Sequence, residues 1–533
     1  MSIGQLLAAG RFFARLPFFL RNRISLPEAR AAIRARLEQR AARLLDRIRG
    51  DVFLDPGSAW HRLFRHAGCE FGDVESAVRK DGVEAALDRL FRAGIYLSID
   101  EFKGRVPVIR GSLRLDTGPD SFRFPRASGD LTVSSGGSRS EGTVTFLDFR
   151  FIREGASNYL LCMDAWGGTE WVKALWSSPG IGARFELLQM AACGDAPRAW
   201  FSPIDPADPS SPLALGWHVR GLVAVSAIAG RPLPAPVWAP LTDPTPVVRF
   251  LAATLRQGAI PVVLSFPSPA VRVCLAALEQ NIDIAGSRFM LVGEPITRAR
   301  VETIRRAGCI SIPRYATIET GTVGYGCPAG EHSDEVHLLQ DRYAVIQPGE
   351  DNGCGLPPRA LLLTALGNRS PFLMINYAPG DQAHLHRREC GCPLHKLGLP
   401  LVLHDIRSYE KLTGCGVTFL GTEVIDILET ALPDRFGGAP TDYQLVEEEA
   451  ADGQALLVLV AHPSLGPVDE EDLGRFFLNR LSAGSVSARG MVQMWRDSGT
   501  LRIARRPPTV SPAGKILHLH VTCPAASEEK VEP

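Results

Sequence analysis

The sequence lacks several features that would place it in a class at once. It has no excess of charge, because 58 lysines and arginines are balanced by 58 aspartates and glutamates. This balance disfavours nucleic acid or an anionic membrane surface as the main partner. No apolar run approaches the roughly twenty residues of a membrane-spanning helix, so no transmembrane segment is expected. The 11 cysteines are too sparse and irregular for a disulfide scaffold, which favours a reducing, cytoplasmic compartment.

Two common catalytic motifs are also missing. No Gly-x-Ser-x-Gly elbow occurs, and no Gly-Lys-Ser/Thr follows the loop at 134–143, which excludes a Walker-type phosphate site. That loop nevertheless contains three glycines and no apolar side chain, directly after a predicted strand at 131–133. Its backbone N–H groups and hydroxyls could converge on an anion. By itself it fits a phosphate-binding loop and a solvent-exposed linker equally well.

The 533 residues divide into three regions that differ in hydrophobic periodicity and expected secondary structure. Helical periodicity, including a helix over 26–50, runs to about residue 95, and we expect an N-terminal helical region at 1–95. The segment 96–405 contains short β-like runs, a loop-heavy, proline-rich stretch at 198–245 that suggests a connection between subdomains, and a regular alternation of strands and helices after residue 259. That alternation predicts an α/β domain with a mostly parallel sheet. A smaller α+β pattern follows over 406–533, and it includes a predicted helix over 422–430.

Five short motifs occur in order along the chain. They are Ser134–Thr143, Gly293-Glu294-Pro295, Tyr315-Ala316-Thr317-Ile318-Glu319-Thr320-Gly321, Gly380-Asp381 and Pro512-Ala513-Gly514-Lys515. Their order and spacing resemble the acyl-adenylate-forming superfamily, most closely its phenylacetate-CoA ligase-like and acyl-protein synthetase branch, over roughly residues 90–520. The resemblance implies a large N-terminal adenylate-forming (AMP-binding) domain joined by a hinge to a small mobile α+β C-terminal domain. The stretch from Arg407 to Gly421 can be laid on the family's hinge without a gap.

The resemblance also implies roles for individual residues. Lys515 and Glu319 would be catalytic, with Lys515 reaching the α-phosphate and Glu319 holding Mg²⁺. Tyr315 would stack on adenine, and Asp381 would bind the ribose. The ATP-binding residues implied in this way are Ser134, Ser135, Gly136, Gly137, Ser138, Thr143, Gly293, Glu294, Pro295, Tyr315, Asp381 and Arg407.

The chain departs from the family pattern at several of these motifs. Arg139, Ser140 and Glu141 stand where relatives have Gly, Lys and Pro, so the family's lysine is missing and an acid would face the phosphates unless it points away or Arg139 offsets it. Ala316 and Ile318 replace a glycine and a hydroxyl residue of the central motif. In the hinge, Tyr409-Glu410 stand for Asp-Asp and Cys415 for an arginine. These changes keep open the alternative of a catalytically weakened fold that serves as a binding or scaffold subunit.

A second constellation consists of cysteines and histidines. Cys390-Gly391-Cys392 could join Cys327 and a histidine around a structural Zn²⁺, since thiolate and imidazole are preferred zinc ligands. Similar Cys…His…Cys-x-Cys sets occur in phenylacetate-CoA ligase-like proteins, and the resemblance favours His337 over His332 as the fourth ligand. Free buried cysteines with surface histidines are the alternative. The histidines at 384, 386, 395 and 404 have no defined spacing and are expected to be surface residues.

The resemblance implies ATP-dependent activation of a carboxylic acid to acyl-AMP, followed by transfer to a thiol. Coenzyme A is the expected acceptor, and an acyl carrier protein or a protein cysteine is the alternative. The cofactors would be ATP and Mg²⁺, with structural Zn²⁺ depending on the cluster. Residues 159–171 and 290–296 are expected to line the acyl pocket, with Tyr159, Trp166 and Trp171 as its aromatic side chains. The sequence leaves the oligomeric state open, a homodimer included.

Overall fold

A computed structural model gives the fold of the chain. It describes residues 3–123, 131–134, 144–205, 207, 216–241, 243–294, 296, 298–317, 319–350, 352–367, 370–408, 412–414, 417–419, 424, 427–438, 442–449, 455–483, 486–509 and 519–521. Among the described helices, none combines the length and the apolar character needed to cross a membrane.

Helices fill the N-terminal region. They are α1 (Ile3–Arg21), α2 (Leu26–Glu38), α3 (Arg40–Ile48), the π-helical turn η1 (Arg49–Phe53), α4 (Ala59–His66), α5 (Phe71–Asp81), α6 (Val83–Arg92) and the short α7 (Ile99–Phe102). The single helix expected over 26–50 is instead two helices that meet at Gln39, which caps both of them. In α1, Phe12 and Phe19 are buried and stack on Phe149, so this face packs against the large domain.

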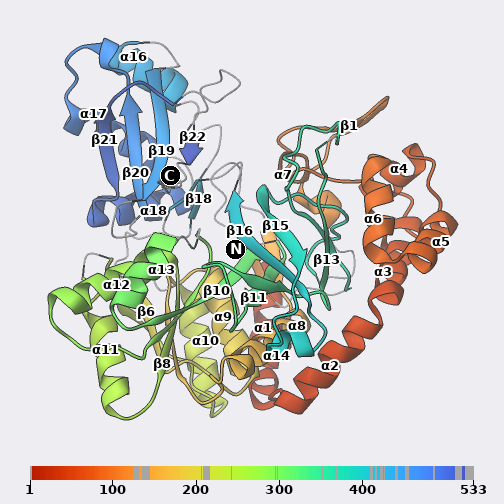
Figure 1. Cartoon of the computed structure of the whole chain (residues 1–533), viewed down its shortest axis with the longest axis horizontal. Helices are drawn as coiled ribbons and strands as arrows, with labels where there is room; N and C mark the ends of the chain where they lie inside the picture. Colours follow the sequence, from red (N-terminus) through yellow and green to blue (C-terminus); the bar gives the residue numbers. More distant parts are fainter. Residues whose placement is uncertain are drawn as a thin grey trace, which may run out of the picture.

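A ten-stranded sheet forms the centre of the large domain (Figure 1). Its order is β15 (Asp381–Arg387), β16 (Leu401–Ser408), β12 (Val336–Leu338), β11 (Gly321–Gly326), β10 (Ile310–Thr317), β9 (Arg288–Leu291), β8 (Pro261–Ser265), β5 (Val172–Trp176), β6 (Ala199–Ser202) and β7 (Pro236–Trp238). The strands from β10 to β7 are parallel, and those from β15 to β10 are antiparallel.

The parallel half is built from strand–helix units and is covered on both faces. Its helices are α8 (Phe149–Ala165), α9 (Ile181–Ala192), α10 (Trp217–Ile228), α11 (Thr245–Arg256), α12 (Pro267–Glu279) and α13 (Arg298–Arg306). Along β8, Val262 and Leu264 face one hydrophobic core and Val263 faces the other. A strand buried on both faces needs a continuous apolar run, and this is the pattern seen in the sequence. Within the stretch 198–245, expected to be loop-heavy, the structure has β6, α10 and β7, which take up less than half of its residues.

Short elements complete the large domain. They are β1 (Val108–Arg110) paired with β2 (Leu113–Leu115), the 3₁₀ turn η2 (Pro119–Phe122), β3 (Leu131–Ser134) paired with β4 (Val144–Leu147), β13 (Tyr343–Ile346) paired with β14 (Leu362–Ala365), and helix α14 (Pro393–Lys396). Strand β16 continues to Ser408 and so crosses the division expected at residue 405.

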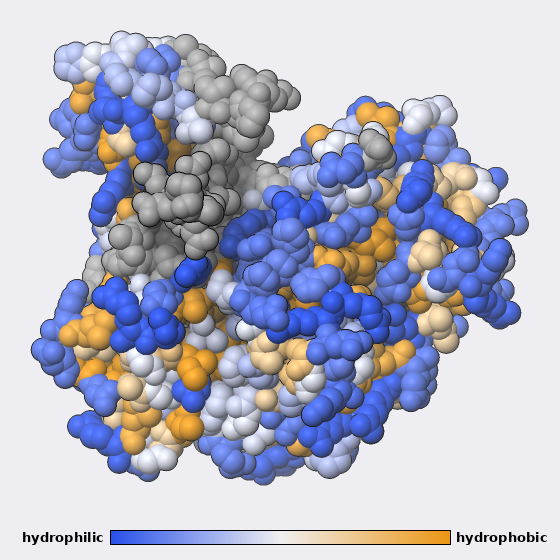
Figure 2. Space-filling model, in the orientation of Figure 1, coloured by the Kyte–Doolittle hydropathy of each residue, from blue (hydrophilic) through white to orange (hydrophobic). Residues whose placement is uncertain are grey.

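The C-terminal elements lie at the upper left of Figure 1, in a lobe that projects from the large domain (Figure 2) and shares a hydrophobic core with it. They are β17 (Leu412–Gly414), β18 (Val417–Phe419), η3 (Ile427–Ala431), α16 (Leu432–Phe436), β19 (Tyr443–Glu449), β20 (Ala455–Ala461), η5 (Pro463–Leu465), α17 (Glu470–Ser482), α18 (Val486–Ser498), β21 (Leu501–Arg505) and β22 (Leu519–Val521). Four of these strands form one sheet, in the order β21-β20-β19-β22. The helix expected over 422–430 lies partly outside the described residues, and its described end is the π-helical η3, which leads into α16.

Candidate nucleotide site and metal cluster

The central motif lies where the parallel and antiparallel halves of the sheet meet. Residues Ile310–Pro313 of β10 pair with β9, whereas Arg314–Thr317 pair with β11. Tyr315 is therefore just beyond the carboxyl end of the parallel strands, which is where ligands bind in open α/β sheets. Arg314 anchors this end of the strand, because its buried guanidinium pairs with Glu186 at 2.6 Å.

Two predicted nucleotide ligands that are far apart in sequence meet here. The hydroxyl of Tyr315 donates a hydrogen bond to Asp381 Oδ2 at 2.9 Å. Burial raises the pKa of Tyr315 well above its usual value, and the Asp381 carboxylate adds to this rise. The phenol therefore remains protonated and orients the carboxylate. Asp381 begins β15 directly after Gly380, whose φ of 91° is readily adopted only by glycine.

Glu319 lies in the turn from β10 to β11, and its side chain is 4% exposed. Its carboxylate forms an ion pair with Lys103, with Nζ 2.9 Å from Oε1. The turn is shaped by Thr317, whose hydroxyl accepts the Thr320 backbone N–H at 3.2 Å. A fixed carboxylate at the carboxyl edge of the parallel strands is the type of ligand that Mg²⁺ uses together with substrate phosphates.

The segment Gly293-Glu294 follows β9 at the same edge of the sheet. Gly293 has φ of 86°, and a Cβ there would lie 2.9 Å from the ring of Phe266, so only glycine fits. The Glu294 side chain is buried and pairs with Arg300 of α13 at 3.3 Å. The acid therefore ties this turn to the next helix. Pro295 lies outside the described residues.

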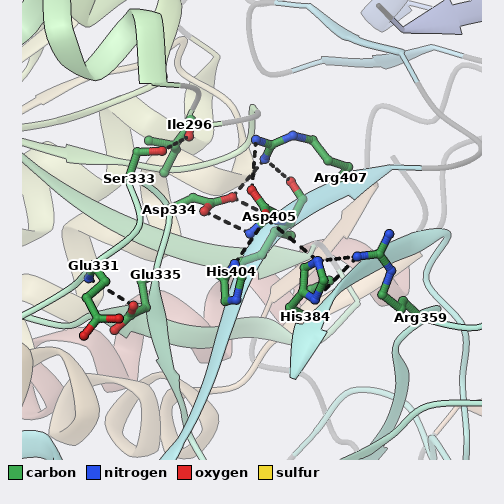
Figure 3. A network of polar contacts seen from close by, with 12 residues as sticks. Ile296, Glu331, Ser333, Asp334, Glu335, Arg359, His384, His404, Asp405 and Arg407 are labelled. Carbon is green, nitrogen blue, oxygen red and sulfur yellow. Dashed lines mark hydrogen bonds and ion pairs between the residues drawn. The ribbon is translucent and has the colours of Figure 1, made fainter. Parts of the chain in front are cut away.

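Arg407 belongs to a network centred on Asp334 (Figure 3). Two residues of β16, Asp405 and Ile406, lie opposite the single Ala383 of β15, which makes a β-bulge with Asp405 at φ of 51°. The buried Asp334 carboxylate accepts the Asp405 and Ile406 backbone N–H groups at 3.0 and 2.8 Å. It also accepts Arg407 Nη1 at 2.8 Å. One carboxylate thus fixes both the bulge and the predicted ATP ligand Arg407.

The remaining predicted nucleotide ligands are not described by the structure. Ser135, Gly136, Gly137, Ser138, Thr143 and Lys515 all lie outside the described residues, and Ser134 is described only as the last residue of β3. Their roles stay predictions.

The predicted metal ligands come together. Cys327, His337, Cys390 and Cys392 have their ligand atoms within 4.8 Å of one another. His337 Nε2 lies 3.5 Å from Cys390 Sγ and 3.2 Å from Cys392 Sγ. Bond lengths of about 2.3 Å to sulfur and 2.0 Å to nitrogen give about 3.5 Å between such atoms on a tetrahedral zinc. The donor set Cys₃His and its spacing therefore fit Zn²⁺.

Hydrogen bonds from neighbouring groups favour the metal-binding forms of His337 and Cys392. His337 Nδ1 lies 2.7 Å from the Leu399 carbonyl, an arrangement that leaves Nε2 for an ion when Nδ1 carries the proton. Hydrogen bonds from Cys327 and His337 lower the pKa of Cys392, although burial acts in the opposite direction. His332 is not in the cluster. Its ring stacks on His404, with centroids 3.8 Å apart.

Three features of the site had no clear signal in the sequence. The pairing of Lys103 with Glu319 joins positions more than two hundred residues apart. Asp334 belongs to none of the motifs described in the sequence. The histidines at 384, 386 and 404, expected as a loose cluster of surface residues, pack together, with ring centroids 4.8 and 5.2 Å from His404.

The aromatic side chains expected in an acyl pocket lie in or against the hydrophobic core, and their role there stays a prediction. Tyr159 and Trp171 are buried in this core, and Trp166 packs against it and donates to the Gly326 carbonyl at 3.0 Å. A cavity of about 710 Å³ is lined by parts of α4, β2 and η2, including Trp60, Phe122 and Arg123. None of the predicted site residues lines this cavity.

Comparison with known proteins supports the fold. No protein-family model matches the chain, and no curated protein sequence matches it. Among solved structures, it is similar to a 2-hydroxyisobutyryl-CoA ligase in complex with 2-HIB-AMP and CoA in the thioesterification state. The TM-score is 0.53 at 15% identity, covering 94% of this chain and 91% of that one. An o-succinylbenzoate CoA synthetase double mutant from Bacillus subtilis, bound with a product analogue, is matched at a TM-score of 0.40 and 12% identity, over 73% of this chain and 68% of that one. The chain has the fold of the AMP-forming acyl-CoA ligases.

Proposed function

We propose that this protein uses ATP to activate a carboxylic acid as acyl-AMP and then transfers the acyl group to the thiol of coenzyme A. The observation that carries the proposal is the convergence of Tyr315, Glu319 and Asp381 at the carboxyl edge of the parallel strands. The first and last of these are joined by the 2.9 Å hydrogen bond. These are the positions to which the family resemblance assigns adenine, metal and ribose binding.

The two half-reactions place different demands on the protein. In the first, an oxygen of the acid attacks the α-phosphorus and the bond to pyrophosphate breaks. In the second, a thiolate attacks the acyl carbon and AMP leaves. Both need positioning and charge stabilisation more than proton transfer. Asp381, oriented by Tyr315, would accept ribose hydroxyls, and Lys515 would neutralise charge on the α-phosphate and the attacking oxygen.

The metal ions would have separate duties. Mg²⁺, held by Glu319 and the nucleotide, supplies charge neutralisation on the phosphates when bound. A Zn²⁺ ion in the Cys₃His cluster would have four protein ligands and no open position, so its role would be structural. It would join the segment before β12 to the loop at 390–392.

Adenylation followed by transfer to a carrier protein or a protein cysteine is the second candidate, since none of the described residues of the nucleotide site selects the thiol. A binding or scaffold subunit is a third. The altered residues Arg139, Ser140 and Glu141 of the predicted phosphate loop favour it.

The decisive experiment is ATP–pyrophosphate exchange with a panel of carboxylic acids, followed by mass spectrometry for acyl-AMP. We expect exchange with at least one acid, and loss of exchange in Lys515→Ala. Addition of CoA or of a carrier protein to the acyl-AMP complex then identifies the acceptor. If the folded protein binds ATP with no acid-dependent exchange across the panel, the scaffold function is favoured.

A further inference from the structure

Lys103 forms an ion pair with the Glu319 carboxylate, which the proposed function assigns to Mg²⁺ binding. The ammonium lies 2.9 Å from Glu319 Oε1, and the two side chains are 13% and 4% exposed. A buried carboxylate is costly without a compensating charge, so this ion pair stabilises Glu319 in the nucleotide-free protein.

The segment that carries Lys103 is tightly held. The preceding helix α7 begins with a capping box, in which Ser98 and Glu101 bond to each other's backbone N–H groups. The Lys103 N–H bonds to the Ile99 carbonyl at 2.9 Å, and the Thr117 hydroxyl donates to the Glu101 carbonyl at 3.0 Å. The ammonium is therefore held at Glu319 by an ordered backbone.

A lysine ammonium and a divalent cation compete for one carboxylate oxygen. Mg²⁺ binds such oxygens at about 2.0 to 2.1 Å, well inside the space that the ammonium occupies. Two like charges at this separation, away from bulk water, repel strongly. The ion pair must therefore open before Mg²⁺ can bind to Glu319 Oε1.

We propose that Lys103 is a positioning residue that competes with Mg²⁺ for Glu319 and so sets the Mg²⁺ concentration at which the protein binds nucleotide. This inference rests on the proposed function, because it requires a magnesium–nucleotide complex at Glu319. In the absence of nucleotide, Lys103 holds the carboxylate in place. When the complex binds, the ammonium leaves the carboxylate.

The experiment measures the binding of a non-hydrolysable ATP analogue by calorimetry at a series of Mg²⁺ concentrations and at fixed ionic strength. Lys103→Met is expected to lower the half-saturating Mg²⁺ concentration about fivefold or more, a typical size for coupling between sites. Lys103→Arg is expected to raise it, because a guanidinium can bond to both carboxylate oxygens. Lys80→Met is the control, since it removes an exposed lysine of α5 and should leave the titration unchanged.

A second readout is thermal unfolding without nucleotide. Lys103→Met should unfold at a lower temperature than the wild type, because it leaves Glu319 without this buried ion pair, and Mg²⁺ alone should restore part of the loss. If Lys103→Met does not fold, Lys103→Arg still tests the competition. The inference would be overturned if a folded Lys103→Met variant needed as much Mg²⁺ as the wild type or more, or if Lys103→Arg left the requirement unchanged. Either result would leave the proposed function standing. If the wild type binds no nucleotide at any Mg²⁺ concentration, the proposed function fails as well.

Discussion

Replacing Asp334 with asparagine tests how the bulge in β16 is held. The carboxylate accepts three hydrogen bonds, from the backbone of Asp405 and Ile406 and from the Arg407 guanidinium. Both backbone donors belong to the bulge, where the regular pairing with β15 is interrupted. An amide has a single oxygen and no charge, and its NH₂ group would face a donor. At least one of the three contacts must therefore be lost in the Asp334→Asn variant.

The size of the effect follows from burial. The Asp334 side chain is 4% exposed, whereas Arg407 is 26% exposed and can turn to water. The main loss is then one backbone N–H left without an acceptor, which costs about 2 kcal/mol. At about 1.4 kcal/mol per factor of ten, the amide at 405 or 406 that loses its acceptor should exchange with solvent about 30-fold faster.

Hydrogen–deuterium exchange of peptides covering residues 400–408 measures this directly. Asp341→Asn is the matched control, because Asp341 is also a buried carboxylate and pairs with Arg36 at 2.7 Å. It should leave exchange over 400–408 unchanged. If Asp334→Asn folds and exchange over 405 and 406 equals that of the wild type, Asp334 does not hold the bulge, and the described network would be incorrect.

Three further predictions concern the nucleotide site and the metal cluster. Freshly purified protein should contain about one zinc per chain by metal analysis, and Cys392→Ser should lower the unfolding temperature with little effect on ATP affinity; protein prepared without chelators that contains no zinc would contradict this. Lys515→Ala should stop pyrophosphate exchange while transfer from added acyl-AMP continues, and near-normal exchange would remove Lys515 from the reaction. Arg139→Ala should weaken ATP binding and Glu141→Lys should not, as measured by nucleotide titration at fixed salt and Mg²⁺; unchanged binding in Arg139→Ala would show that Arg139 does not replace the loop lysine.

The parallel half of the sheet could be predicted from local pattern. Strands such as β8 and β9 are short apolar runs between amphipathic helices, and burial on both faces produces this pattern. The stretch 198–245 was expected to be loop-heavy because of its prolines, and the three elements inside it were not predicted. Prolines at the edges of β7 and α11 are compatible with these elements, since Pro236 begins a strand and Pro246 lies in the first turn of a helix.

The candidate site was predictable to the extent that motifs mark it. The Cys-x-Cys pair and His337 converge as the family resemblance implied, and glycine at 391 adopts φ of 66° in the tight turn between the cysteines. Lys103 and Asp334 were not predictable in this way. Each acts through a partner that only the folded chain brings near, and a single sequence contains no signal for such pairs.

The left-handed backbone at Asp405 limits how this sequence can change over evolution. Glycine, asparagine and aspartate adopt φ near 50° readily, whereas a β-branched residue there would be strained. The fold persists at 15% identity to a solved ligase, so most positions can change freely. Position 405 tolerates few residues. A mutation at position 334 that removes the carboxylate acceptor requires a new acceptor for the backbone N–H groups of the bulge. We therefore expect these two positions to vary together among sequences that keep this bulge.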